Sequence, residues 1–285
     1  MEATRHQLGA PCHHPLELTL HKASNDIKGV VQINPATGVT ERMYLPFAQY
    51  LAAQGFAVVT FNYRGVGLQS MEAKSVDAGF TDWADHDIER ITSWVSEHFD
   101  SLPHFAIGHS FGGHAIGLCE SSQRLTAAVT ICSQAGCLRF IRPLHERWKV
   151  ALLLKVIGPV TAKLLGYFPG KRLGVSENVP AKIMQQWSRW TSMPNYFFDD
   201  PEVDAAKRFA RPAMPLLAIG IDDDRWAPSE AIDLMTSYFT GCAVTRMQLG
   251  SHESQGAPVG HMGYFRSRHA DTLWPVIGQW LHRQL

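Results

Sequence analysis

The sequence has few cysteines and no excess charge of either sign. Its five cysteines are scattered and form no C-x-x-C pair, which favours free thiols in a reducing compartment over a disulfide framework. Lysine and arginine together number 26, and aspartate and glutamate also number 26. A chain without net charge lacks the basic excess that attracts a nucleic-acid backbone or an anionic membrane. We therefore expect no nucleic-acid partner.

Long apolar runs are missing as well. The first residues include Glu2, Arg5 and His6 and lack the apolar stretch that a signal peptide needs. The longest apolar segment, residues 150–168, is interrupted by lysine, glycine and proline, so it is a poor membrane span. We expect a cytoplasmic protein with no stable membrane insertion.

Metal-ligand motifs of recognisable spacing are also missing. Cys12-His13-His14 offers three potential ligands, but no second ligand cluster stands at a suitable distance from it. We expect no metal ion and no organic cofactor.

The sequence does contain enough apolar residues for a large core. Of its 285 residues, 45% are hydrophobic and 10% aromatic, as in globular proteins. Continuous apolar runs are typical of strands buried on both faces of a parallel sheet. Such runs, with three further strand patterns, occupy residues 16–22, 29–33, 57–61, 104–108, 126–132, 214–220 and 243–249.

Helical spacing separates these strands. Apolar residues recur at intervals of three and four within residues 44–51, 84–95, 231–239 and 273–281. Alternation of strands and helices predicts an α/β fold with a doubly wound, mostly parallel sheet. Residues 137–212 carry helical, aromatic-rich patterns and no strand signal. We interpret them as a helical cap inserted into a core formed by residues 1–136 and 213–285.

A G-x-S-x-G motif, Gly108-His109-Ser110-Phe111-Gly112, lies between a predicted strand and a predicted helix. This context is that of a nucleophile elbow, in which the serine occupies a tight turn and the glycines avoid clashes with strand and helix. A serine hydroxyl needs a base that takes its proton and an acid that orients the base.

The acid and the base are expected later in the chain. Asp222, Asp223 and Asp224 follow the strand at 214–220, at the strand end where the elbow also opens. Asp224, in the loop just before the next helix, is the preferred acid, with Asp223 as the alternative. His261, flanked by glycines, is the preferred base, and His252 in the same loop is the alternative.

Backbone N–H groups must also stabilise the oxyanion that forms during acyl transfer. One is expected from Phe111, directly after the serine. The other is expected from the loop Asn34-Pro35-Ala36-Thr37-Gly38. Proline has no N–H, so Ala36 or Thr37 would donate, and we assign Ala36.

With these motifs in this order, the chain resembles the α/β-hydrolase superfamily over nearly its whole length. Its motifs at residues 35–38, 108–113, 222–224 and 260–266 are similar to those of a little-characterised bacterial group of predicted α/β hydrolases. The Asn34-Pro35 pair is more like the loop of homoserine acetyltransferases.

The expected activity is that of a serine hydrolase. It would cleave a carboxylic ester, thioester or amide of a small, apolar acyl substrate through an acyl-enzyme. An acyltransferase with the same residues, or a ligand-binding homologue without activity, remains an alternative.

Overall fold

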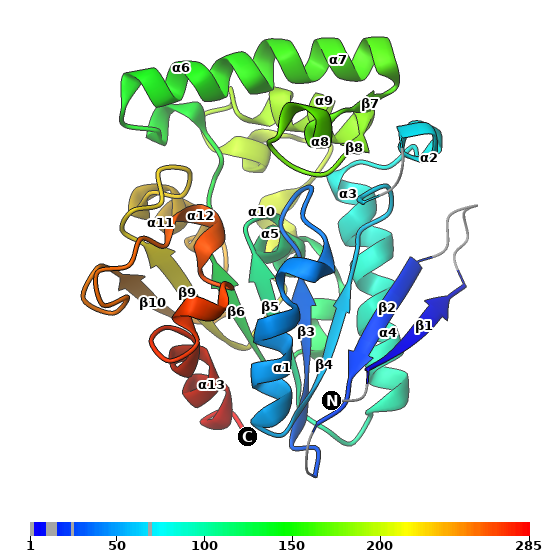
Figure 1. The fold of residues 1–285 in the computed structure, drawn as a ribbon, viewed down its shortest axis with the longest axis vertical. Helices are drawn as coiled ribbons and strands as arrows, with labels where there is room; N and C mark the ends of the chain where they lie inside the picture. Colours follow the sequence, from blue (N-terminus) through cyan, green and yellow to red (C-terminus); the bar gives the residue numbers. More distant parts are fainter. Residues whose placement is uncertain (1–2, 10–15, 24–25, 68–69) are drawn as a thin grey trace.

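A mostly parallel sheet forms the centre of the computed structural model, which describes residues 3–9, 16–23, 26–67 and 70–285 (Figure 1). The segment Cys12-His13-His14 lies outside the described residues. The strands of the sheet are β1 (Ala3–Leu8), β2 (Leu16–His21), β3 (Gly29–Asn34), β4 (Phe56–Phe61), β5 (His104–His109), β6 (Ala127–Ile131), β9 (Pro215–Ile221) and β10 (Ala243–Leu249).

The strand order is β1-β2-β4-β3-β5-β6-β9-β10. β2 pairs antiparallel with both β1 and β4, and every other pairing in the sheet is parallel. This confirms the expected α/β fold class. The sequence did not predict β1, because this edge strand alternates exposed and half-buried residues and has no apolar run.

Both faces of the central strands are buried, which explains why these strands are continuous apolar runs. Neighbouring residues in one strand belong to different cores: Val58 packs on one face and Val59 on the other. Helices α1 (Leu45–Ala53) and α13 (Trp274–His282) cover the first face. On the second face lie α5 (Phe111–Leu118) and a continuous helix. That helix joins α3 (Phe80–Asp82), the π-helical turn η2 (Trp83–Ile88) and α4 (Glu89–His98).

Short helices occupy the connections. They are η1 (Glu41–Met43), α2 (Ser70–Ser75), η3 (Ser121–Arg124), η4 (Leu138–Phe140), η6 (Tyr196–Asp199), α10 (Ala205–Phe209), α11 (Ser229–Thr236), α12 (Gly260–Gly263) and η7 (Ser267–His269).

The segment expected to form a cap lies mainly beyond the carboxyl ends of the strands, at the top of Figure 1. Its elements there are α6 (Leu144–Leu152), the π turn η5 (Leu153–Ile157), α7 (Gly158–Leu165), β7 (Tyr167–Phe168), α8 (Gly170–Leu173), β8 (Val179–Pro180) and α9 (Ala181–Trp190).

Two features of this segment differ from expectation. The two-residue strands β7 and β8 pair with each other, although the sequence gives no strand signal. Helix α10 packs against α5 of the core, where Arg208 Nε donates to the Leu118 carbonyl at 2.7 Å. No helix among the described residues combines the length and apolar character required to cross a bilayer.

Candidate active site

Ser110 occupies a strained turn between β5 and α5. Its backbone has a φ of 52°, a conformation that L-residues rarely adopt. A Cβ on Gly112 would lie 2.0 Å from the Asn34 carbonyl oxygen, and one on Gly108 would lie 2.4 Å from the Gly112 backbone. Only glycine therefore permits strand, turn and helix to approach this closely, and the turn presents Ser110 at the carboxyl edge of the sheet.

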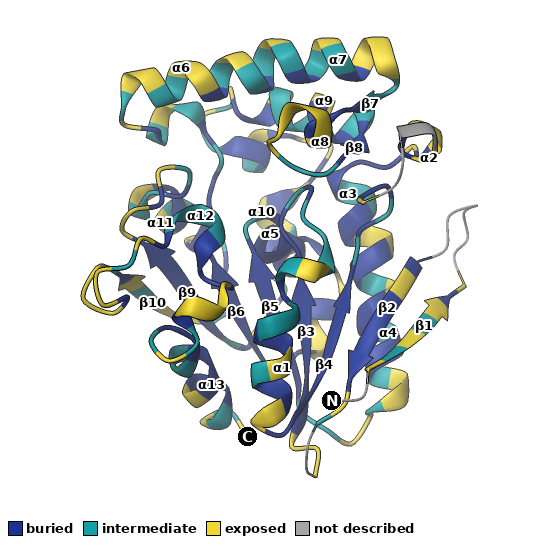
Figure 2. Ribbon diagram, in the orientation of Figure 1, coloured by how far each residue is buried: buried dark blue, intermediate teal, exposed yellow. Residues whose placement is uncertain are grey.

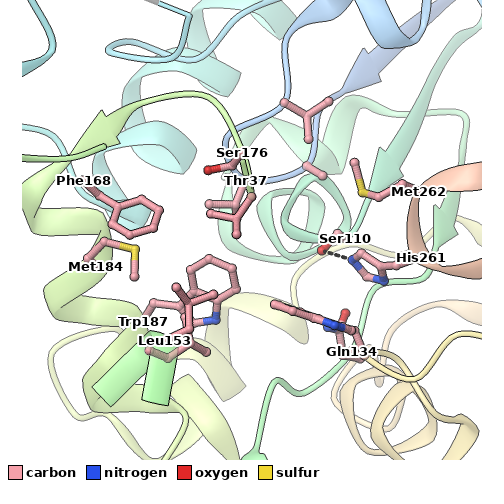
Figure 3. A pocket seen from close by; sticks show the side chains of 15 residues that line it. Thr37, Ser110, Gln134, Leu153, Phe168, Ser176, Met184, Trp187, His261 and Met262 are labelled. Atoms are coloured by element: carbon pink, nitrogen blue, oxygen red, sulfur yellow. Dashed lines mark hydrogen bonds between the residues drawn. The ribbon is translucent and has the colours of Figure 1, made fainter. Parts of the chain in front are cut away.

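A chain of two hydrogen bonds joins Ser110 to a buried carboxylate. The Ser110 hydroxyl lies 3.1 Å from His261 Nε2 (Figure 3). On the other side of the imidazole, His261 Nδ1 donates to Asp224 Oδ2 at 2.7 Å. The Asp224 side chain is fully buried, and that of His261 is 16% exposed. The structure thus brings together the three residues that sequence reasoning preferred, from three separate loops.

The surroundings of Asp224 favour its ionised form. Burial raises the pKa of its carboxyl. The interactions with His261, the Cys132 thiol and the Trp226 N–H lower this pKa by more than burial raises it, so it lies below its ordinary value. Oδ1 accepts the N–H groups of Trp226 at 2.8 Å and Ala227 at 3.1 Å. These bonds fix the carboxylate and leave Oδ2 for the imidazole.

The two alternative residues occupy other positions. Asp223 accepts the backbone N–H groups of Val259 at 2.9 Å and Gly260 at 2.7 Å, and so holds the loop that carries His261. The His252 side chain is 98% exposed and lies 3.6 Å from Glu253. Neither side chain is hydrogen-bonded to Ser110 or His261 among the described residues. The hydrogen bonds by which Asp223 holds this loop were not predicted from the sequence.

The N–H groups expected to stabilise the oxyanion differ in whether another group already accepts their hydrogen bond. The Phe111 N–H is the first of α5, where a helix leaves its N–H groups without intrahelical partners. The Ala36 N–H, our sequence-based assignment, donates instead to the Tyr44 hydroxyl at 2.9 Å. Thr37 also lines the cavity beside Ser110, and its N–H donates to none of the described residues. Of these two residues, Thr37 is therefore the one whose N–H has no acceptor among the described residues.

Tyr44 continues into a second buried chain of hydrogen bonds. His109 Nε2 lies 2.8 Å from the His261 carbonyl oxygen, so Nε2 carries the proton and donates. His109 Nδ1 is then an acceptor, and the Tyr44 hydroxyl donates to it at 2.9 Å. Burial, first, and the nearby His261 lower the pKa of His109 to about 3, which keeps this ring neutral.

Cys132, Asp224 and His261 place a thiol, a carboxylate and an imidazole within 4.8 Å of one another. Burial, followed by the charge of Asp224, raises the pKa of Cys132 well above its ordinary value. Metals bind the thiolate, whereas the buried thiol here keeps its proton. This group therefore fits a hydrogen-bonded acid and base better than a metal site.

The Ser110 hydroxyl opens into a cavity of about 310 Å³ that η5, β7 and α9 also line. Apolar side chains form most of its wall, including Leu153, Phe168, Met184 and Trp187, which lie on the side opposite His261 (Figure 3). Gln134 is an exception: it is 93% buried, and its Oε1 accepts no hydrogen bond from the described residues.

Similar structures share this fold over their full length. A carboxyl esterase from Bacillus coagulans in complex with glycerol has a TM-score of 0.70 and 14% identity, with 99% of each chain covered. An esterase domain from Rhodothermus marinus has a TM-score of 0.62 and 16% identity, also with 99% of each chain covered. Est1E from Butyrivibrio proteoclasticus with bound ferulic acid has a TM-score of 0.64 and 13% identity over 98% of each chain.

Sequence comparison identifies the family. No curated protein sequence matches the chain. The sequence model described as "Alpha/beta hydrolase family" matches residues 35–271, which include the elbow, Asp224 and His261. The chain therefore belongs to the alpha/beta hydrolase family and is a hydrolase.

Proposed function

We propose that the protein is a serine esterase that cleaves carboxylic esters with an apolar acyl group. The observation that carries the proposal is the hydrogen-bond chain from Asp224 through His261 to Ser110. It supplies a nucleophile, a base within hydrogen-bond reach and an acid that orients the base. The esterases among the similar structures agree with this chemistry.

In the proposed mechanism, His261 Nε2 takes the Ser110 proton as Oγ attacks the ester carbonyl carbon. The carbonyl oxygen becomes an oxyanion, which the N–H groups of Phe111 and Thr37 stabilise. Asp224 stabilises the imidazolium that forms. His261 then gives the proton to the leaving alcohol, and an acyl-enzyme remains on Ser110.

Water completes the reaction. His261 takes a proton from a water molecule, whose oxygen attacks the acyl carbon, and then returns that proton to Ser110 as the carboxylic acid leaves. No metal ion or organic cofactor is needed for either half of the reaction, and Asp224 stays ionised throughout.

The cavity supports an apolar acyl group. Its wall is aromatic and aliphatic and is formed in part by Phe168, Met184 and Trp187. Burial of apolar substrate surface against this wall would stabilise the enzyme–substrate complex. Gln134 also lines the cavity, but its Oε1 is buried, so the open part of the wall is mainly apolar.

The test is hydrolysis of p-nitrophenyl esters across a series of acyl-chain lengths. Ser110→Ala is expected to lower kcat/KM by on the order of 10³-fold or more. Ser237→Ala, at an exposed serine on the core, is the matched control and keeps the wild-type rate. An unchanged rate in folded Ser110→Ala would contradict the mechanism. Preferential transfer of the acyl group to added alcohols would show an acyltransferase instead of a hydrolase.

A further inference from the structure

The outermost helix of the inserted segment is apolar on two opposite sides. It runs without interruption through α6, η5 and α7, over 22 residues. Its inner side is formed by residues at four-residue intervals that are buried toward the protein: Val150, Leu154, Gly158 and Ala162. Its outer side repeats the same interval with a second set, which we call the outer stripe: Leu144, Trp148, Leu152, Val156, Val160 and Leu164.

The outer stripe faces solvent along the whole helix. Each of its six residues is at least half exposed, with Trp148 at 74% and Leu164 at 77%. Figure 2 shows exposed turns recurring along α6 and α7. A surface helix of a globular protein ordinarily has polar residues on this side. A contiguous exposed apolar surface of this kind marks a binding surface.

The helix geometry helps to keep the stripe together. A four-residue interval drifts around an α-helix by about 40° per step, because one turn takes 3.6 residues. The wider π turn at Leu153–Ile157 reverses part of this drift. The stripe therefore stays on the outer side for longer than a regular helix would allow.

Basic residues surround the outer stripe. Residues 137–176 contain eight lysines and arginines but one glutamate, a net charge of +7, whereas the whole chain has none. Six of these cations are exposed: Arg139, Arg142, Lys149, Lys163, Lys171 and Arg172. Three of the six lie near a carboxylate, Arg142 near Glu230, Lys149 near Glu146 and Lys171 near Glu177. The zero net charge of the whole chain thus conceals an excess of cations in this part of the sequence.

We propose that the outer stripe and its cations dock on an anionic lipid surface, with the helix lying in the plane of the interface. Apolar side chains, tryptophan included, would enter the acyl boundary while lysines and arginines meet the anionic headgroups. A second copy of this chain fits less well. A two-fold dimer brings the same patch of each copy together, so two surfaces of like charge would meet.

The docking surface lies close to the candidate active site. Leu153 and Leu154, from the same helix, line the cavity beside Ser110. A docked molecule would hold this cavity near the lipid layer, where apolar compounds concentrate. The proposal concerns binding alone and does not depend on the reaction.

The test is co-sedimentation of the full chain with vesicles of phosphatidylcholine, with and without phosphatidylserine. We expect binding to the anionic vesicles that weakens as salt is added. Trp148→Ser and Leu164→Ser should each lower the partition coefficient by about tenfold. Lys163→Ala should lower it by about fivefold. Because all three side chains are exposed, the variants should fold, as circular dichroism would verify.

Two variants away from the outermost helix serve as controls. Val244→Ser replaces an exposed apolar residue on β10, and Lys207→Ala removes an exposed cation on α10. Both should bind vesicles as the wild type does. Equal sedimentation with neutral and anionic vesicles, or wild-type binding by Trp148→Ser, would overturn the proposal. Concentration-dependent dimers that Trp148→Ser abolishes, without vesicle binding, would assign the stripe to a second copy and overturn it too.

Discussion

The Tyr44 hydroxyl lies 2.9 Å from His109 Nδ1, and this bond links two loops that face Ser110. On one side Tyr44 accepts the N–H of Ala36, in the loop that includes the proposed oxyanion donor Thr37. On the other side His109 donates to the carbonyl of His261. The position of the proposed oxyanion site is thereby coupled to that of the proposed base.

Replacement of Tyr44 by phenylalanine tests this link. Tyr44→Phe leaves the buried N–H of Ala36 and the buried Nδ1 of His109 without their partner. We expect the free energy of unfolding, measured by urea denaturation, to fall by about 1–3 kcal/mol. Tyr50→Phe, at a half-buried tyrosine of the same helix, is the control and should change it by less than about 0.5 kcal/mol. Equal stability of the two variants would contradict the link.

The adjacent carboxylates of Asp223 and Asp224 should differ sharply in their effect on kcat. Asp224→Asn removes the charge that stabilises the His261 imidazolium and favours the wrong tautomer, so kcat should fall by on the order of 10³-fold or more. Asp223→Asn keeps an oxygen that can accept one of its two backbone N–H groups, so kcat should fall by about tenfold or less. A larger loss with Asp223→Asn would reverse the two roles.

Three buried histidines make the stability sensitive to acid. Burial is the first cause that lowers the pKa of His104 to about 4, His109 to about 3 and His114 to about 4, from an ordinary value of 6.5. The unfolded chain therefore binds more protons than the folded one between pH 6.5 and about 4. Their contribution is complete above pH 6.5 and is lost as the pH falls through this window.

Near pH 5, where the histidines are protonated in the unfolded chain and neutral in the folded one, together they add about 4 kcal/mol of unfolding free energy per pH unit, since each contributes about 1.4 kcal/mol. Asp87 opposes them in part, because burial raises the pKa of its carboxyl to about 6. Urea denaturation at several pH values between 7 and 5 measures this slope. His104 makes no hydrogen bond through either ring nitrogen with the described residues, so His104→Leu should lower the slope near pH 5 by about 1.4 kcal/mol per pH unit. Stability that does not change between pH 7 and 5 would contradict this account.

Gly112→Ala should prevent the elbow from forming. Its Cβ would meet the Asn34 carbonyl oxygen at 2.0 Å, and neither backbone can move without displacing β3 or α5. We expect loss of soluble protein or a fall in unfolding free energy of about 4 kcal/mol or more. Gly174 also has a positive φ, but no atom lies within 4 Å of its Cβ position. Gly174→Ala should therefore lower the free energy of unfolding by only about 1 kcal/mol, the backbone strain alone. A well-folded, active Gly112→Ala would refute the close approach.

Local patterns in the sequence predicted the parts of the fold that depend on burial. The strands at Phe56–Phe61 and Pro215–Ile221 are continuous apolar runs because both of their faces are covered. The elbow at Ser110 was recognisable because its steric requirements fall on residues adjacent in sequence. Strand β1 was missed, since an edge strand that is partly exposed needs no apolar run.

Contacts between distant residues could not be predicted in the same way. Nothing near Ala36 in the sequence shows that Tyr44 occupies its N–H, because that bond depends on how α1 packs under the loop. The bonds from Asp223 to Gly260 depend likewise on two loops meeting in space. The charge of the inserted segment was visible in sequence, but the net charge of the whole chain concealed it.

Covalent labelling with a fluorophosphonate tests the central claim, that His261 activates Ser110 as a nucleophile, most directly. Mass spectrometry of the intact protein and of its peptides locates the label. We expect one label per chain, on Ser110, no label in Ser110→Ala and strongly slowed labelling in His261→Ala. Labelling at another serine, or none in wild-type protein that hydrolyses p-nitrophenyl esters, would contradict the account.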